Sequence, residues 1–421
     1  MIKINDVRKK INNNNLLLYF FLLLPISILL GNFAINTSML LISIIFMIIL
    51  INKKNQIQTD KKILLLLLFF FLSLVINLIF TKDFYLSSPR VIKIFFLIYF
   101  ITSFRHLILN SDNKEMIIYK IWSIILLVII LDLIFEFFVG KNIIGLSSVM
   151  PGSRLASFTG EESVIGNFFS GFVLLFLSYF NYRYPNNRIF NFLLAIFVIG
   201  ISFIIGERAN FIKTFIIIFF FIILIYDIKL RIKIFFITTL LLLFVFFINF
   251  NGAYKDRYYE QLIKLFEKDG INNYLQNSQY GAHYNVAYEI FKDNPIFGVG
   301  IKNFRNESGN KKYDNLKHPL NDLRSATHPH QLHFEFLAET GIFGYLCFLI
   351  FIFISLYWSI RSYLLNKNNF QLSGILFVLI SILPLLPSGS FLSTFNSSIF
   401  WINYAIMMGY INIKNKRPEL S

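Results

Sequence analysis

Cysteine and charge are both scarce in this sequence of 421 residues. Cys347 is the single cysteine, which excludes a disulfide framework and a metal site built from cysteines. Charged side chains make up 15% of the chain, whereas soluble domains contain about 25%. These two deficits exclude a disulfide-stapled secreted domain and an ordinary soluble domain.

Apolar side chains take the place of the missing charge. Hydrophobic residues reach 56%, and phenylalanine alone contributes 52 residues. A helix of about 20 apolar residues crosses a bilayer, and hydropathy along the chain indicates about twelve such segments. We therefore predict an all-α integral membrane protein, with one polytopic domain over residues 1–421. The predicted spans lie near residues 16–32, 36–51, 63–80, 89–104, 116–139, 163–180, 189–206, 209–226, 233–250, 333–360, 371–387 and 395–412.

Basic side chains gather in alternate loops between these segments. Short loops rich in lysine and arginine stay in the cytoplasm, so the pattern predicts that both termini are cytoplasmic. The same asymmetry accounts for the net charge of +16 without a nucleic-acid partner. The basic residues on the predicted inner side are Lys3, Arg8, Lys9, Lys10, Lys53, Lys54, Lys61, Lys62, Arg183, Arg188, Lys229, Arg231, Lys233, Arg361, Lys367, Lys414, Lys416 and Arg417.

Residues 251–332 form a long segment that this orientation places on the outer face, between the ninth and tenth predicted spans. Two stretches of it, 259–266 and 284–291, carry apolar side chains at helical spacing. The second stretch ends before Pro295, and a glycine-containing turn follows. These helices either lie on the membrane surface or pack on each other as a small lid.

Three of the six histidines lie close together, directly before an apolar stretch. His328, His330 and His333 could bind a metal, hydrogen-bond at a helix start, or act as a general base. No nearby cysteine or aspartate completes a tetrahedral metal set, whereas a neutral imidazole accepts a proton near pH 7. Small residues at 338, 341 and 344 would let a second helix approach closely. General base catalysis is therefore the favoured interpretation.

Several cations lie on the predicted outer face, where topology does not require them. Arginine holds phosphate oxygens through two parallel hydrogen bonds, so a set of such cations suits a bound pyrophosphate. The candidate contacts are Arg154, Arg208, Lys302, Arg305 and Arg324.

Other outer charges have simpler expected fates. We expect Lys93 and Lys213 to extend to lipid headgroups, as cations at helix ends usually do. Asp132 and Glu136 lie one turn apart on the fifth predicted span. Because Arg90 and Lys93 lie at a similar height, a structural ion pair is the favoured interpretation there, and a proton path is the alternative.

Three motifs together resemble the bacterial O-antigen ligases. His330-Gln331, followed by the stretch 341–344, is similar to the family's histidine motif. The turn 294–300 and the stretch 206–208 resemble two further motifs of the family. The histidine motif is shared with some O-antigen polymerases and O-linked oligosaccharyltransferases. One departure is His283, since many relatives have an arginine near this position.

The resemblance implies a GT-C-like bundle in the bacterial inner membrane, with a periplasmic loop over residues 251–332 and an active site on that face. It implies a metal-independent, inverting glycosyltransferase of lipopolysaccharide biosynthesis that needs no cofactor. The donor would be a glycan on undecaprenyl pyrophosphate, and the acceptor a sugar hydroxyl of lipid A–core. His330 would be the base, with His328 orienting it or the acceptor.

Two alternatives remain open. A polymerase would extend the lipid-linked glycan instead of transferring it to lipid A–core. A transporter for that glycan would need outer cations and many spans, but also an internal repeat and paired broken helices. The sequence has neither of these last two features, so transport is the less favoured of the two.

We predict that residues 251–332 face the periplasm. Cysteines introduced at Asn273 and Asn310 should therefore react with a membrane-impermeant thiol reagent in intact spheroplasts. Labelling that appears only after lysis would overturn the orientation.

Overall fold

The computed structural model describes residues 13–52, 60–110, 114–162, 164–384 and 386–413. The structure is 78% helix, and no strand occurs in these ranges, which confirms the all-α class. Many of the basic residues used to orient the chain lie outside the described residues, namely Lys3, Arg8, Lys9, Lys10, Lys53, Lys54, Lys414, Lys416 and Arg417.

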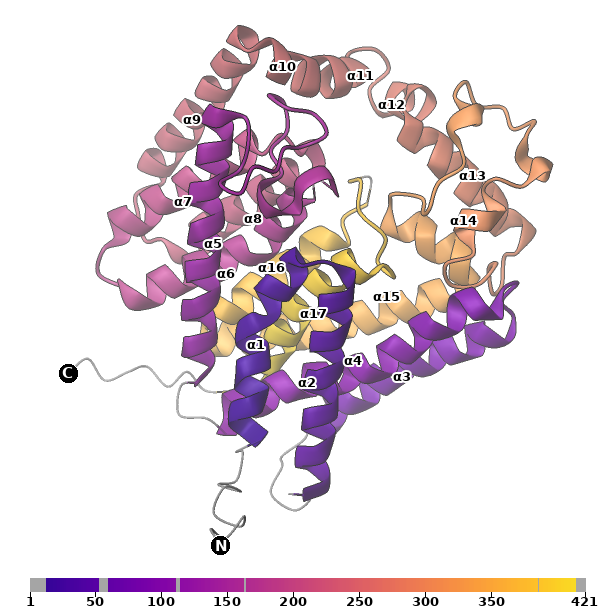
Figure 1. Ribbon diagram of the computed structural model, residues 1–421, viewed down its shortest axis with the longest axis horizontal. Coiled ribbons are helices and arrows are strands. Elements are labelled where there is room, and N and C mark those ends of the chain that lie inside the picture. Colours follow the sequence, from indigo (N-terminus) through magenta and orange to yellow (C-terminus); the bar gives the residue numbers. More distant parts are fainter. Residues whose placement is uncertain (1–12, 53–59, 111–113, 163, 385, 414–421) are drawn as a thin grey trace, which may run out of the picture.

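A helix occupies most of each of the twelve predicted segments (Figure 1). Within the described residues, eight helices are long and apolar enough to cross a membrane, and three shorter apolar helices accompany them. The protein is therefore a multi-pass membrane protein, and the count of twelve spans stays a prediction. The helices are α1 (Asn13–Leu29), α2 (Asn32–Asn52), α3 (Lys61–Ile79), α4 (Phe84–Asn110), α5 (Lys114–Val139), α6 (Ile165–Arg183), α7 (Arg188–Ile204), α8 (Arg208–Ile225), α9 (Leu230–Phe250), α15 (Leu332–Asn366), α16 (Asn369–Ser381) and α17 (Thr394–Gly409).

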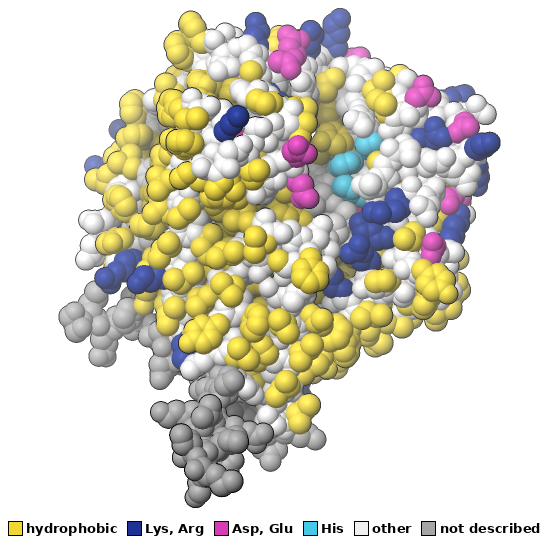
Figure 2. All heavy atoms as spheres, viewed as in Figure 1, with side chains coloured by type: hydrophobic (Ala, Val, Ile, Leu, Met, Phe, Trp, Pro, Cys, Tyr) yellow, Lys and Arg dark blue, Asp and Glu magenta, His cyan; other side chains and the backbone are white. Residues whose placement is uncertain are grey.

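The bundle is built around α17, which packs on α2, α4, α6 and α16. Almost every side chain of α17 is buried, including Trp401 and Tyr404. The outward faces of the surrounding helices carry exposed leucine, isoleucine and phenylalanine side chains, and Figure 2 shows them as a broad apolar surface. Apolar side chains on both the inside and the outside of a bundle are typical of helices that are surrounded by lipid.

The eleventh predicted span is shorter than expected. It was predicted to reach residue 387, but α16 ends at Ser381. Pro384 and Pro387 follow, and proline lacks the backbone N–H that would continue the helix. The chain instead crosses the end of the bundle as a loop before α17 begins, and this loop contacts the histidine segment.

The segment between α9 and α15 runs over one end of the bundle (Figure 1). It contains α10 (Gly252–Tyr254), the π-helix η3 (Lys255–Ile263), α11 (Lys264–Glu267), α12 (Ile271–Asn277), α13 (Gln279–Asp293) and α14 (Phe304–Glu307). The two predicted amphipathic helices do not pack mainly on each other. The first lies against α8 and α9, and α13 packs on α15. Val286, Ile290 and Phe304 form a small separate core there with Ala338 of α15.

Helix α15 is broken at Gly341, and a turn fills the break. Gly341 has φ 62° and ψ −169°, a region open essentially to glycine alone. An intact helix would bond the amides of Ile342 and Phe343 to the carbonyls of Ala338 and Glu339. Instead these amides donate to Pro295 and Ile296, and these carbonyls accept from Val299 and Gly300, all at 2.8–3.1 Å.

This break corrects the small-residue face predicted at residues 338, 341 and 344. Their spacing fits a continuous helix, but the close approach is made by the backbone of the turn at 295–300. A β-carbon on Gly341 would lie 2.3 Å from the Ile296 carbonyl oxygen, and one on Gly298 would lie 2.5 Å from the Glu339 carbonyl carbon. Backbone therefore packs directly on backbone at this point.

Replacing Gly341 with alanine should destabilise the fold. Backbone strain alone costs about 1–3 kcal/mol at such a residue, and the new β-carbon would also push the turn away. Gly200→Ala is a matched control, because Gly200 lies inside α7 with no heavy atom within 4 Å of the added β-carbon. Thermal unfolding of the purified protein should show a lower midpoint for Gly341→Ala only. Equal midpoints for the two variants would contradict the account of the break.

Candidate functional site

His330 lies at the centre of a stack of aromatic rings. Its ring centroid is 4.0 Å from that of His328 and 5.2 Å from that of His283, with Tyr280 at 5.5 Å. His283 and Tyr280 come from α13, so two segments far apart in the sequence meet here. Figure 2 shows the histidine side chains inside a hollow of the molecular surface.

The backbone around His330 is held in an uncommon conformation. His330 has φ 60°, and its carbonyl accepts the amide of Ser388 at 2.8 Å. The next residue, Gln331, caps α15, because its side-chain oxygen accepts the amide of Phe334 at 3.0 Å. A left-handed residue directly before a helix cap turns the imidazole away from the helix axis and into the stack.

Burial keeps these imidazoles neutral. It lowers the pKa of His330 from 6.5 to about 4, and the neighbouring His283 adds to that effect. Burial also lowers the pKa values of His283 and His328. The ring nitrogens of His283 and Nε2 of His328 are buried, and the backbone of Leu323 and that of Ser388 lie near these two rings. At neutral pH the stack therefore carries no charge, and His330 can accept a proton.

His333 serves the fold rather than the stack. Its Nδ1 lies 3.0 Å from the hydroxyl of Tyr345, and its Nε2 lies 2.8 Å from the carbonyl oxygen of Ile382. Both ring nitrogens are therefore engaged, and the residue ties α15 to the loop after α16.

A first group of arginines lies beside the stack. Arg208 begins α8 and interacts electrostatically with Tyr280, whose ring contacts His330. Arg154 pairs with Glu207 at 3.5 Å, and Arg257 donates to the carbonyl of Gly206 at 3.0 Å. The three guanidinium groups lie close enough to repel one another: the charge of Arg154 is felt at Arg208, and the charges of both are felt at Arg257. We call Arg154, Arg208 and Arg257 the Arg208 group.

Asp132 and Glu136 hold the loop that carries Arg154. Asp132 accepts the amide of Ile143 and the hydroxyl of Ser157, and Glu136 accepts the amides of Ala156 and Ser157. The predicted ion pair with Arg90 and Lys93 is therefore wrong. Three backbone amides and one hydroxyl of a loop satisfy the two carboxylates instead, and backbone amides carry no sequence signal.

A second group of cations lies at the same end of the bundle. Lys302 donates from Nζ to the hydroxyl of Ser390 at 2.8 Å, and Arg90 interacts with both Lys302 and Arg305. Lys93 interacts with Arg90 and Lys302. Lys302 also acts on His328, so this group borders the stack as well. We call Arg90, Lys93, Lys302 and Arg305 the Lys302 group.

Two lysines expected to reach lipid headgroups point inward. Nζ of Lys93 is buried without a hydrogen bond. Nζ of Lys213 donates to the carbonyl of Pro387 at 2.7 Å. The expectation was wrong for both, because the Lys93 amine is buried and the loop after α16 accepts a hydrogen bond from the Lys213 amine.

The predicted site residues are thus divided between two groups. Arg154 and Arg208 lie in one, and Lys302 and Arg305 lie in the other. Arg324 belongs to neither: it forms an ion pair with Asp314 and donates to the carbonyl of Asn321 within its own loop. A structural task therefore accounts for Arg324.

Sequence reasoning missed several members of these groups. His283 was noted only as a departure from a motif, and Arg257 was not considered. Arg90 and Lys93 were assigned to an ion pair with α5. The spacing of cations before or after a span places them at an end of the bundle, but it does not tell which of them meet.

The described residues contain no group of three or more His, Cys, Asp and Glu side chains that could hold a metal ion. The rings of His283 and His330 are stacked, with 24° between their planes. Stacked rings direct their nitrogens sideways rather than toward one point, so coordination by this pair would require a rearrangement.

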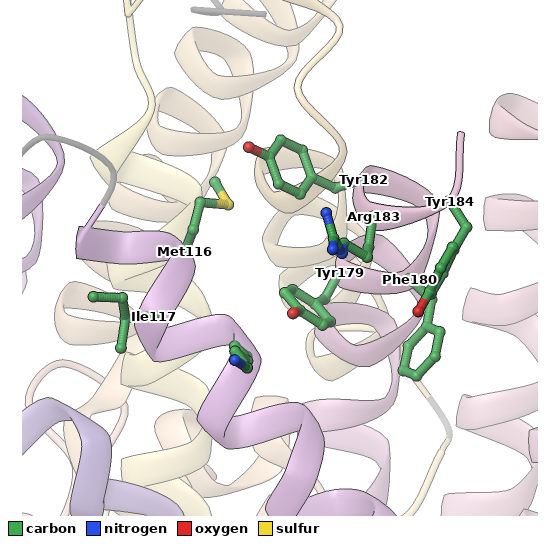
Figure 3. A pocket seen from close by; sticks show the side chains of 8 residues that line it. Met116, Ile117, Tyr179, Phe180, Tyr182, Arg183 and Tyr184 are labelled. Atoms are coloured by element: carbon green, nitrogen blue, oxygen red, sulfur yellow. The ribbon is translucent and has the colours of Figure 1, made fainter. Parts of the chain in front are cut away.

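A separate cavity of about 470 Å³ lies at the opposite end of α6 (Figure 3). It is lined by the first turns of α5 and the last turns of α6, including Lys120, Tyr182 and Arg183. The start of α6, in contrast, contacts Glu207 through the amide of Gly166. The cavity is therefore distant from the histidine stack and forms no part of this site.

A family model described as O-antigen ligase matches residues 192–349. None of the curated proteins matches the chain. The matched range runs from α7 to the second part of α15, so it includes Arg208, His283 and His330 as well as the broken helix.

Proposed function

We propose that this protein is an O-antigen ligase that moves a glycan from undecaprenyl pyrophosphate to lipid A–core, since residues 192–349 match a family model described as O-antigen ligase. The family implies a glycosyltransferase-like enzyme. One observation carries the finer proposal: His330 is a neutral, half-buried base that lies between two groups of cations at one end of a membrane bundle.

The Arg208 group binds the donor pyrophosphate. Arg208 and Arg154 offer planar guanidinium groups, which match phosphate oxygens with paired hydrogen bonds. Pyrophosphate leaves readily once its developing negative charge is stabilised, and fixed cations in a site shielded from water do this without a metal ion. The Lys302 group is left for another partner.

His330 activates the acceptor. Its free ring nitrogen takes the proton of the sugar hydroxyl while that oxygen attacks the anomeric carbon of the donor glycan. The bond from that carbon to the pyrophosphate breaks on the opposite face, so the configuration inverts and undecaprenyl pyrophosphate leaves. His328 packs on the base and orients it. His283 stands beside it as a neutral neighbour instead of the family's arginine.

This chemistry requires an activated donor outside the cytoplasm, where nucleotide sugars are absent. We therefore place the protein in the inner membrane, as one polytopic domain with cytoplasmic termini, and residues 251–332 in the periplasm. Membrane lipids surround the bundle, and the lipid tail of the donor reaches the site from the bilayer.

Purified protein should transfer a lipid-linked glycan to lipid A–core, and His330→Ala should lower that rate by about 10²–10⁴-fold, the usual worth of a general base. Product analysis by mass spectrometry and gel mobility checks both parts. A product that consists only of longer lipid-linked glycan would identify a polymerase instead.

His333→Gln is the control for this loss. Glutamine retains hydrogen-bonding groups toward Tyr345 and the loop, so the rate should stay within a few-fold of the wild type. A His330→Ala protein that transfers at the wild-type rate would remove His330 from the mechanism.

The pH dependence of transfer should report the half-buried imidazole of His330. His330 is active when unprotonated, and its pKa in the free protein is about 4 instead of 6.5. The acidic limb of kcat/KM should therefore lie well below pH 6.5. A bound pyrophosphate favours the imidazolium, so the limb of kcat should lie at higher pH than that of kcat/KM.

Steady-state rates between pH 4 and pH 8, with recovery at pH 7 as the check for irreversible loss, test this prediction. Two limbs that coincide near the ordinary histidine pKa would contradict it.

A further inference from the structure

We propose that the Lys302 group binds a phosphate group of the acceptor, on the side of the histidine stack away from the Arg208 group. This inference rests on the proposed function and adds to it: the donor and the acceptor each have a cationic site, and the base lies between them. The sequence had assigned Lys302 and Arg305 to the donor.

The Lys302 group is assembled from two separate parts of the chain, and a third part connects them. Arg90 and Lys93 come from the first turns of α4, and Lys302 and Arg305 follow the turn that fills the break in α15. The loop before α17 connects them: Ser390 accepts from Lys302 at 2.8 Å, and Thr394 accepts from Arg90 at 3.4 Å. Their convergence is therefore a feature of the fold and not of local sequence.

Two buried carboxylates accompany these cations. Glu335 and Glu339 lie one turn apart on the first part of α15, and both interact with Lys302. Glu335 is fully bonded, since it accepts the hydroxyl of Ser390 and the amide of Phe391. Both carboxylate oxygens of Glu339 are buried without a hydrogen bond, and the amides of Lys302 and Phe304 lie near them.

The charges of this group do not balance. Four cations face two carboxylates, which leaves a formal excess of two positive charges. Nζ of Lys93 is buried and has no hydrogen-bond partner, although an unpaired buried charge is costly. An anion with about two negative charges, such as a phosphate monoester, would compensate this excess.

The position of the group indicates which substrate carries the anion. Lys302 interacts electrostatically with His328, and Arg208 interacts electrostatically with Tyr280. The ring of His330 contacts both of these rings. Figure 2 shows lysine and arginine side chains beside the histidines at the edge of the hollow. With the donor pyrophosphate on the Arg208 side, the acceptor hydroxyl approaches His330 from the Lys302 side.

The test compares acceptors with and without phosphate. Purified full-length protein in phosphatidylcholine nanodiscs is given lipid A–core, or the same material after dephosphorylation, and transfer is measured against acceptor concentration. Wild-type protein should show a KM for the phosphorylated acceptor roughly 10- to 100-fold lower, as expected for hydrogen bonds to charged groups.

Two variants address the site itself. Arg305 is exposed, and Lys93→Met removes an unpaired buried charge, so both Arg305→Ala and Lys93→Met should fold. Each should raise the KM for the phosphorylated acceptor toward that for the dephosphorylated one, with the donor KM unchanged. Lys311→Ala removes an exposed cation of the same loop and serves as the control. Arg208→Lys should do the reverse and raise only the donor KM.

Four results would overturn the proposal. The first is an equal wild-type KM for the two acceptors, and the second is a rise in the donor KM for Arg305→Ala. The third is a variant that loses the same transfer activity with both acceptors. The fourth is that the difference in KM between the two acceptors disappears when phosphatidylglycerol is added. The last result would assign the site to membrane headgroups. If no transfer to lipid A–core occurs, thermal stabilisation by phosphorylated but not dephosphorylated lipid A–core still tests the site separately from the ligase function.

Discussion

The replacement of two helical hydrogen bonds by four hydrogen bonds to a turn, at the break in α15, is the interaction on which the site depends. Two amides and two carbonyls that an unbroken helix would pair with each other are paired with the turn at 295–300. The turn is thereby fixed against α15, and its other side contacts the connection between α3 and α4, since the amide of Lys82 donates to the carbonyl of Val299 at 3.0 Å. Lys302 follows directly, so the break positions the Lys302 group relative to His330.

Burial does two opposite things at this end of the bundle. It removes charge from the imidazoles, because an isolated imidazolium is poorly solvated there. It also makes the uncompensated cations on either side of them attractive to anions, because water no longer screens them. A neutral base between two cationic sites is the arrangement expected for joining two anionic substrates. A single site for both substrates would place their charges against each other.

Long apolar runs and the asymmetry of basic residues are strong signals, and they were sufficient to predict the helices and the all-α class. The same signals placed His330, Arg208 and the other cations at related ends of their helices. The break at Gly341 could not be predicted, because the spacing of small residues also fits an intact helix and a positive φ has no signature in one sequence. The division of the cations, and the use of Asp132 and Glu136 to hold a loop, depend on contacts between distant segments.

A structure of the protein with a non-hydrolysable undecaprenyl pyrophosphate donor would test the central claim most directly. The account predicts that the pyrophosphate contacts Arg208 and Arg154, with the anomeric carbon facing His330 and the Lys302 group left open. Pyrophosphate bound to Lys302 and Arg90, with the Arg208 group empty, would contradict it.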